Sequence, residues 1–230
     1  MGYYDNVNTS LLEQVQPQAC RLLELGCGAG AMARAVRERL PAPPYYVGVE
    51  LDPEALERAR DALDLAVPCN LDQVPDWSTD PQLAEVARGR FDHLIIGDVL
   101  EHLREPWQVL RQGVASLAPG GRVLTCIPNV QHWSTWVQLA RGSWPRSDSG
   151  LFDRTHLRWF TLDDMVALLR DTGLVVEQVV PRVFQAEQGR QVMRTLEPLA
   201  QLVGADVDKL QQRGLPLQYV LVAHKPATAA

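Results

Sequence analysis

The stretch Leu22–Gly30, "LLELGCGAG", decides the fold. An apolar run that contains one acid, Glu24, leads directly into glycines at Gly26, Gly28 and Gly30. Glycine adopts left-handed backbone angles at no steric cost and lets a ligand approach the main chain closely. A strand, a glycine turn and a helix in this order place free backbone N–H groups at the start of the helix. The stretch therefore predicts a ligand-binding turn at one edge of a sheet.

Short apolar runs alternate with helical patterns around this turn. The predicted strands are Leu22–Leu25, Tyr45–Glu50, Leu65–Cys69, Phe91–Gly97, Arg122–Ile127, Leu174–Val183 and Gln218–His224. The predicted helices are Ala31–Leu40, Pro53–Leu63, Gln82–Arg88, Pro106–Leu117, Thr161–Thr172 and Gly189–Val203. This alternation is typical of parallel strands joined by right-handed helical crossovers. The predicted fold class is α/β, a doubly wound, seven-stranded, mostly parallel sheet with an inserted cap after the fifth strand.

Composition limits the classes of partner. The chain has 230 residues, 46% of them hydrophobic, which is enough for one domain that spans residues 1–230. The formal net charge of -6 argues against a nucleic-acid partner, because binding to phosphates needs a basic surface. The four cysteines form no CxxC pair, which favours a reducing compartment. No signal peptide or apolar run of membrane-spanning length is visible, so a cytoplasmic protein with no membrane partner is expected.

Two acids indicate what the glycine turn binds. Gly26-x-Gly28-x-x-Ala31 fits a dinucleotide fingerprint, and Glu50 closes the second strand, where it could accept both hydroxyls of a ribose. Glu24 precedes the turn by two residues and would repel a pyrophosphate, whereas it would attract a cationic ligand. A purely structural turn and a nicotinamide-dependent oxidoreductase are the alternatives at this point.

Four blocks carry a resemblance to a known family. "LLELGCGAG", "VGVELDPEAL", "FDHLIIGDVLEHL" and "LAPGGRVLTCIPN" together resemble class I S-adenosylmethionine-dependent methyltransferases over residues 20–130. The resemblance implies S-adenosyl-L-methionine as the cofactor. It assigns cofactor binding to Glu24, Gly26, Cys27, Gly28, Gly30, Glu50, Leu51, Asn70, Leu71 and Asp98.

The resemblance also implies which part of the cofactor each of these residues contacts. The glycine turn would face the methionine part, whose ammonium and sulfonium suit a nearby acid. Glu50 would bind the ribose and Leu51 would pack on the adenine. Asn70 stands where the family usually has an aspartate that meets the adenine amino group, and Asp98 would lie beside the cofactor.

The downstream segments "IPNVQHW" and "GLFDRTHLRWFT" resemble a subgroup of small-molecule and sugar methyltransferases. The implied reaction is O-methylation of a sugar, glycan or natural product, with N- or C-methylation as the alternative. Residues 129–160, rich in tryptophan, are expected to form an acceptor-binding cap that is mobile until ligand binds, and Tyr3 and Tyr4 resemble a lid. The expected partners are a small-molecule acceptor and, as an oligomer, a second copy of the chain.

A hydroxyl acceptor needs a base to remove its proton. We expect His156, oriented by Asp153, to be that base, with His132 and His102 as further candidates; structural roles for these histidines are the alternative. The run Asp98-x-x-Glu101-His102 resembles ubiquinone-type O-methyltransferases, some of which use a divalent ion. We nevertheless expect no metal here, with Glu101 facing solvent and His102 packed beneath it.

Overall fold

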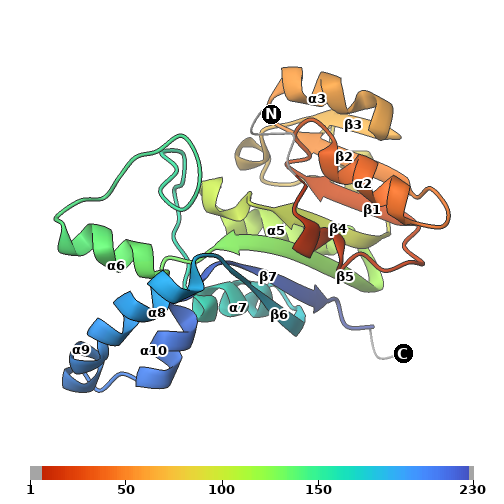
Figure 1. Cartoon of the computed structure of the whole chain (residues 1–230). Helices are drawn as coiled ribbons and strands as arrows, with labels where there is room; N and C mark the ends of the chain where they lie inside the picture. Colours follow the sequence, from red (N-terminus) through yellow and green to blue (C-terminus); the bar gives the residue numbers. More distant parts are fainter. Residues whose placement is uncertain (1–6, 228–230) are drawn as a thin grey trace.

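Seven strands form one sheet in the order β3-β2-β1-β4-β5-β7-β6 in the computed structural model, which describes residues 7–227 (Figure 1). The strands are β1 (Arg21–Leu25), β2 (Tyr45–Glu50), β3 (Leu65–Pro68), β4 (Phe91–Gly97), β5 (Leu117–Pro128), β6 (Val175–Val183) and β7 (Pro216–His224). Strands β1 to β5 pair in parallel, and β7 runs antiparallel to both β5 and β6. The predicted doubly wound, mostly parallel sheet is confirmed. Tyr3 and Tyr4 lie outside the described residues.

Helices cover both faces of this sheet (Figure 1). One face carries α1 (Thr9–Leu12) and α2 (Ala31–Arg39), with α3 (Pro53–Ala59) packed beside the start of α2. The other face carries α4 (Ala84–Ala87), α5 (Pro106–Ala115) and α7 (Leu162–Asp171). Short 3-10 turns lie at η2 (Arg60–Ala62), η3 (Leu71–Gln73) and η4 (Leu100–His102). The remaining helices are α6 (Trp133–Ala140), α8 (Ala186–Thr195), α9 (Glu197–Leu202) and α10 (Val207–Arg213).

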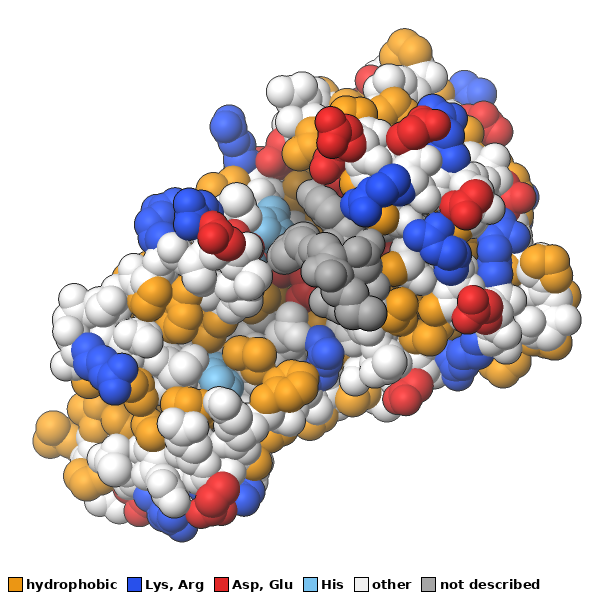
Figure 2. All heavy atoms as spheres, turned by 45° about the horizontal axis from the view of Figure 1, so that its top comes forward, with side chains coloured by type: hydrophobic (Ala, Val, Ile, Leu, Met, Phe, Trp, Pro, Cys, Tyr) orange, Lys and Arg blue, Asp and Glu red, His pale blue; other side chains and the backbone are white. Residues whose placement is uncertain are grey.

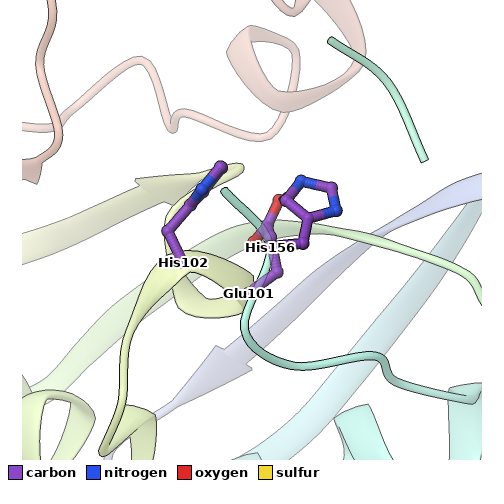
Figure 3. Close-up of side chains that lie close together, drawn as sticks. All are labelled: Glu101, His102 and His156. Carbon is purple, nitrogen blue, oxygen red and sulfur yellow. The ribbon is translucent and has the colours of Figure 1, made fainter. Parts of the chain in front are cut away.

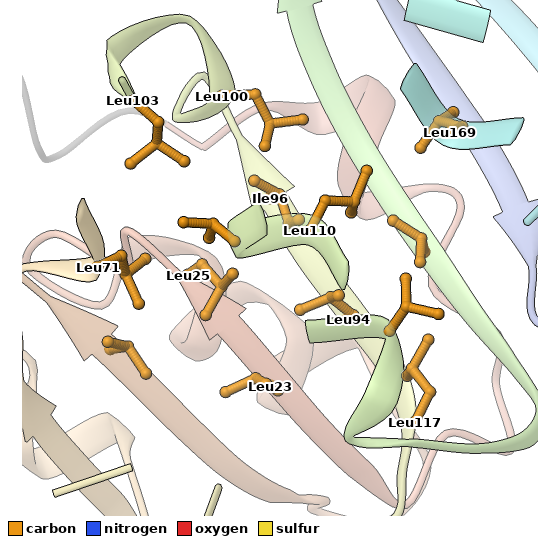
Figure 4. Packing of buried hydrophobic residues seen from close by; sticks show 14 of the residues in the cluster. Leu23, Leu25, Leu71, Leu94, Ile96, Leu100, Leu103, Leu110, Leu117 and Leu169 are labelled. Atoms are coloured by element: carbon orange, nitrogen blue, oxygen red, sulfur yellow. The ribbon is translucent and has the colours of Figure 1, made fainter. Parts of the chain in front are cut away.

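The alternation of side chains along β1 divides the core into two clusters. Leu22 packs with α1 and α2, whereas Leu23 and Leu25 pack on the opposite face with α5 and α7 (Figure 4). Each fully buried leucine stabilises the fold by about 1.5–3 kcal/mol. Because side chains along a strand alternate between the two faces of the sheet, Glu24 lies on the same face as Leu22. The apolar run thus fixes the direction of the one acid that it contains.

Several predicted bounds are corrected by the structure. The segment after β5 was not among the predicted helices, yet it contains α6. The predicted helix Gly189–Val203 is two helices, α8 and α9, and α10 was not predicted. β5 starts earlier than predicted because the "APGG" turn still bonds to the end of β7: the N–H of Gly120 donates to the Lys225 carbonyl, and the N–H of Lys225 to the Gly121 carbonyl. Among residues 7–227, no helix is both long enough and apolar enough to cross a bilayer.

One buried amide joins the end of β5 to the start of β7. Asn129 is fully buried, and its Nδ2 donates to the carbonyls of Arg213 and Pro216, both at 2.8 Å. Its Oδ1 accepts from the N–H of Gln131 at 3.1 Å. The side chain therefore satisfies three backbone groups where the chain leaves and rejoins the sheet.

Replacing Asn129 by Leu should lower the free energy of unfolding by at least about 1–3 kcal/mol, the cost of a buried polar group left unpaired. Urea unfolding of Asn129→Leu against the parent chain measures this. The matched control is Gln131→Ala, because the Oε1 of Gln131 has no partner in the described part of the chain. Equal stability of Asn129→Leu and the control would contradict the assignment.

Candidate active site

The glycine turn after β1 has the backbone that its sequence predicts. Gly26, Gly28 and Gly30 have φ of 71°, 51° and 79°, in the left-handed region that favours glycine. A Cβ on Gly26 would lie 2.4 Å from Cγ2 of Val99, and one on Gly30 would lie 3.0 Å from Cβ of Ala59. Both glycines are therefore needed for close packing as well as for the turn.

Glu50 binds this turn from the end of β2. Its Oε2 accepts from the N–H of Gly28 at 2.8 Å, and its Oε1 accepts from Leu51 and Asp52 at 2.8 and 2.9 Å. An ionised carboxylate offers about four acceptor positions, so three bonds leave room for about one more. Glu50 can thus accept one ribose hydroxyl while it holds the turn, rather than the two that its position in the sequence suggested.

Glu24 lies behind the turn and is almost fully buried. Its Oε2 accepts a 2.8 Å hydrogen bond from the hydroxyl of Tyr46 on β2. Burial raises the pKa of Glu24 to about 8, although the Tyr46 hydrogen bond opposes that rise. A cation placed nearby would favour the ionised form. The side chain of Cys27 packs over Gly48 on β2 and is buried, so only the backbone of Cys27 can face a ligand in the turn.

The residues expected near the adenine divide into two kinds. Leu51 is 64% exposed at the end of β2 and free to pack on a flat ring. The side chain of Asn70 caps η3 by accepting from the N–H of Asp72 at 3.1 Å. Leu71 is buried in the core cluster of β1 and α5, so it supports the site from beneath and offers little surface to a ligand.

Asp98 follows β4 and takes a left-handed backbone, with φ of 53°. Its Oδ1 accepts from Nε2 of Gln218 on β7 at 2.5 Å, and the Oε1 of Gln218 accepts from Arg182 on β6. Burial raises the pKa of Asp98 to about 6, and the Arg182 charge opposes the rise. The strand order of the sheet reverses between β1 and β4, and Asp98 directly follows β4. Its carboxyl group thus lies at the switch point of the sheet, where ligands of this fold class bind.

Glu101, His102 and His156 form a cluster, shown in Figure 3. Glu101 and His102 belong to η4, directly after β4, and His156 comes from the segment between α6 and α7. Glu101 is 1% exposed, which corrects the expectation that it faces solvent. Nε2 of His156 lies 4.0 Å from Oε1 of Glu101, and the two imidazole rings meet edge to face with centroids 4.7 Å apart.

Hydrogen bonds fix the imidazoles differently from the prediction. Nδ1 of His156 pairs with the carbonyl of Leu151 at 3.2 Å. The backbone N–H of His156 donates to the Asp153 carbonyl at 3.1 Å, but within the described residues the Asp153 carboxylate makes no hydrogen bond to the imidazole of His156. Asp153 instead accepts from the hydroxyl of Thr155 at 2.6 Å, and Thr155 Oγ1 lies 3.0 Å from Nδ1 of His102. The turn geometry at residues 153–156 directs the carboxylate away from its expected partner. Asp153 therefore orients His102, through Thr155.

The same bonds assign the protons. The Thr155 hydroxyl gives its hydrogen to Asp153, so its oxygen accepts from Nδ1–H of His102; Nδ1 of His156 donates to a carbonyl. Both Nε2 atoms therefore carry lone pairs. Burial lowers the pKa of each imidazole. Burial also raises the pKa of Glu101 well above its usual range, and the Asp98 carboxylate raises it further.

His132 occupies a separate position. It is the N-cap of α6, and its Nδ1 lies 2.7 Å from the hydroxyl of Ser134. Burial lowers its pKa to about 4. Of the aromatic residues after β5, Trp133 is buried, whereas Trp144 and Trp159 are partly exposed and meet edge to face. His132 is thus a capping residue rather than a surface loop histidine.

Figure 2 shows the surface around these residues. On this face, Lys, Arg, Asp and Glu side chains are scattered among hydrophobic ones, and histidine side chains reach the surface. The arrangement can bind a cation at buried carboxylates and can accept a proton at an imidazole. The three clustered side chains could also hold a metal ion. Glu101, Thr155, Tyr46 and Gln218 were not predicted; only Glu101 had a signal, in its place next to His102.

Comparison with known proteins shows the family of the chain. A family model described as "Methyltransferase domain" matches residues 3–179. The ubiquinone biosynthesis O-methyltransferase of Bordetella avium (strain 197N) is 30% identical over 123 residues, which are 51% of this chain and 48% of that protein. The protein of the same name from Xanthomonas axonopodis pv. citri (strain 306) is 29% identical over 113 residues, 48% of this chain and 44% of that protein. The matched part spans about half the length of these relatives.

A solved structure is similar over nearly the whole chain. The crystal structure of an S-adenosylmethionine-dependent methyltransferase from Mesorhizobium loti has a TM-score of 0.60 and 17% identity, covering 94% of this chain and 96% of that one. At this identity the likeness shows the fold. Together with the family match, it confirms the resemblance of residues 20–130 to class I S-adenosylmethionine-dependent methyltransferases.

Replacing Glu24 by Gln should change how stability depends on pH. The pKa of Glu24 is about 8 when folded, against an ordinary 4.5, so the folded state keeps a proton that the unfolded state releases between these values. The free energy of unfolding should therefore fall as pH rises from about 4.5 to about 8, by several kcal/mol in order of magnitude. Urea unfolding at a series of pH values should give a shallower fall for Glu24→Gln.

Tyr46→Phe is the companion variant. It removes the hydrogen bond that lowers the pKa of Glu24, so its free energy of unfolding should continue to fall to a higher pH than that of the parent chain. Identical slopes for the parent and Glu24→Gln would contradict the buried proton.

Proposed function

Because the chain belongs to the methyltransferase-domain family, we propose that it transfers the methyl group of S-adenosylmethionine to a hydroxyl of a small molecule. The proposed acceptor is a sugar, glycan or natural product, supported by the resemblance of residues 150–161 to that subgroup. The observation that carries O-methylation is the buried Nε2 lone pair of His156 beside η4. The curated relatives are named as O-methyltransferases, which supports the same reaction.

The residues around the glycine turn fit S-adenosylmethionine. Its sulfonium and ammonium are cationic, and Glu24 and Asp98 are buried carboxyl groups whose ionised form a cation would stabilise. The cofactor supplies a methyl group activated by the sulfonium. Glu50 has one acceptor position left for a ribose hydroxyl, and the exposed Leu51 offers an apolar surface for the adenine.

His156 is the proposed base. As the oxygen of the acceptor bonds to the methyl carbon and the carbon–sulfur bond breaks, Nε2 of His156 takes the hydroxyl proton. Nδ1–H stays bonded to the Leu151 carbonyl, which holds the ring in place. The imidazolium that forms lies 4.0 Å from the Glu101 carboxyl, and its positive charge would favour the ionised form of that acid. His102, oriented by Thr155 and Asp153, is the alternative base.

The proposal also covers the cellular compartment, the acceptor cap and the oligomeric state. The cysteines Cys20, Cys27, Cys69 and Cys126 are all free thiols, which supports a reducing, cytoplasmic compartment. Residues 129–160 remain the proposed acceptor cap. A homodimer stays a prediction.

Replacing Glu50 by Ala should weaken S-adenosylmethionine binding by about 1–3 kcal/mol, because three N–H groups and a ribose hydroxyl lose their acceptor. Calorimetry on the purified chain measures the affinity. Glu54→Ala is the control, since Glu54 is an exposed residue in the first turn of α3. Binding of NAD in place of S-adenosylmethionine would point to an oxidoreductase instead.

Replacing His156 by Gln should lower kcat by about 10²–10⁴-fold, the usual contribution of a positioned base, with cofactor affinity nearly unchanged. Hydroxyl acceptors are screened in chelator-treated buffer, and product is detected by mass spectrometry as the gain of one CH₂ group. His132→Gln, outside the cluster, should keep its turnover. Full turnover of His156→Gln would transfer the role to His102, which His102→Gln then tests.

A further inference from the structure

We propose that Arg182 and Gln218 are positioning residues for Asp98: together they hold its carboxylate in place as an anion that binds a cationic group of S-adenosylmethionine. Gln218 follows Asp98 by 120 positions, and Arg182 lies on another strand, β6. The inference rests on the proposed function, because that cofactor supplies the cation. It extends the cofactor site to the last two strands of the chain.

The first argument is a chain of hydrogen bonds that joins Asp98 to β7 and β6. Nε2 of Gln218 donates to Oδ1 of Asp98 at 2.5 Å, and Oε1 of Gln218 accepts from Nη1 of Arg182. Because the donor end of the amide faces the acid and its acceptor end faces the guanidinium, both partners fix the orientation of Gln218. A neutral amide thus lies between two opposite charges, which form no direct ion pair in the described part of the chain.

The second argument is the position of this chain of bonds in the sheet. Gln218 pairs with Arg182 on β6 and with Pro128, the last residue of β5. The amide is therefore at the carboxyl end of β5, the edge of the sheet where ligands bind in this fold class. Val220, two residues further along β7, packs in the cluster under α1 and α2, so Gln218 faces the same side of the sheet as Glu24.

The third argument is that Asp98 lies directly beside the glycine turn. The next residue, Val99, fills the space that a side chain on Gly26 would need, since a Cβ there would lie 2.4 Å from Cγ2 of Val99. Asp98 itself has a φ of 53°, a left-handed conformation that is uncommon outside glycine. Strain of this kind is found at functional sites, where the surrounding structure enforces it. The hydrogen bond from Gln218 is one such constraint on Asp98.

The charge of Arg182 affects how readily Asp98 ionises. Burial raises the pKa of Asp98 to about 6, and the Arg182 charge and the Cys126 thiol oppose that rise. Among the described residues around Asp98, burial also raises the pKa of Cys126 on β5 and of Glu101 on η4 well above their usual ranges, which favours their neutral forms. Gln218 on β7 carries no charge. Arg182 is therefore the charged neighbour that favours the carboxylate.

The carboxylate also has room for a cation. A carboxylate offers about four acceptor positions, of which Gln218 takes one and the Cys126 thiol a second. S-adenosylmethionine carries two cationic groups, a sulfonium and an ammonium, whereas S-adenosylhomocysteine keeps only the ammonium. If Asp98 binds the sulfonium, it distinguishes the methyl donor from the product that remains after transfer.

Calorimetry with S-adenosylmethionine on the full chain, over a series of pH values, tests the proposal. The affinity of the parent chain should fall as pH drops through about 6, where Asp98 gains a proton. Arg182→Gln removes the charge that favours the carboxylate, so the midpoint of this fall should lie at least about 1 pH unit higher. Gln218→Leu should shift the midpoint in the same direction, because the carboxylate loses a hydrogen bond. Arg182→Lys keeps the charge and should restore the midpoint of the parent chain.

Arg190→Gln is the matched control, because it removes an exposed arginine of α8 and should keep the midpoint of the parent chain. Glu24 titrates alike in all these proteins, so its effect cancels from the comparison. Far-UV circular dichroism checks that each variant is folded. A loss of affinity in folded Arg182→Gln that high pH does not recover, or a failure of Arg182→Lys to restore the midpoint, would overturn the proposal.

A parallel titration with S-adenosylhomocysteine identifies the cation. A midpoint shift confined to S-adenosylmethionine assigns the sulfonium to Asp98, and the same shift with both ligands assigns the ammonium. An unchanged midpoint in both Arg182→Gln and Gln218→Leu, or an equal shift in Arg190→Gln, contradicts the positioning role. Failure of the parent chain to bind S-adenosylmethionine at any pH would contradict the proposed function instead, so the two failures are distinguishable.

Discussion

Buried carboxylates are the constraint on which this structure depends. Glu24, Glu50 and Glu101 all lie at or near the carboxyl ends of neighbouring parallel strands, and each is at most 7% exposed. A carboxylate in such a place must be hydrogen-bonded, protonated or paired with a cation. Glu50 accepts three backbone N–H groups, and Glu24 takes a hydroxyl and a raised pKa. In the described part of the chain neither oxygen of Glu101 has a hydrogen-bond partner, so the demand for a cation or a proton is greatest there.

The parts of the site that the sequence predicted are those formed by local backbone. The glycine turn and Glu50 could be placed because strand ends and positive φ values depend on a few adjacent residues. The register of β1 against β2 then brings Tyr46 to Glu24, a contact between residues 22 positions apart that no local pattern indicates. The fold class followed from strand and helix periodicity, whereas the partners of the buried acids needed the assembled sheet.

The contacts of Asp153, His156 and Glu101 show why the rest of the candidate site could not be predicted from the sequence. Asp153 and His156 are three residues apart, a spacing that suggests a pair, yet the local turn directs the carboxylate to Thr155. Glu101 was expected to face solvent. It is buried because Leu157 and Arg158, more than fifty positions later, bond to its carbonyl. Contacts over such distances depend on where the chain returns after α6, and composition does not encode that path.

The antiparallel direction of β7 has a consequence for how this fold can diversify. Because β7 runs against β5 and β6, the excursion at 129–160 and the one at 184–215 both leave and re-enter the sheet at one edge. They also contact each other, since the backbone N–H of Trp133 donates to the Gly214 carbonyl and its side chain packs against Gly189. The two excursions form one contiguous unit beside the half of the sheet that carries β1, β2 and β4. Lengthening or replacing them would change what lies beside the carboxyl ends of β5 and β6 and leave the glycine turn, Glu24 and Glu50 in place.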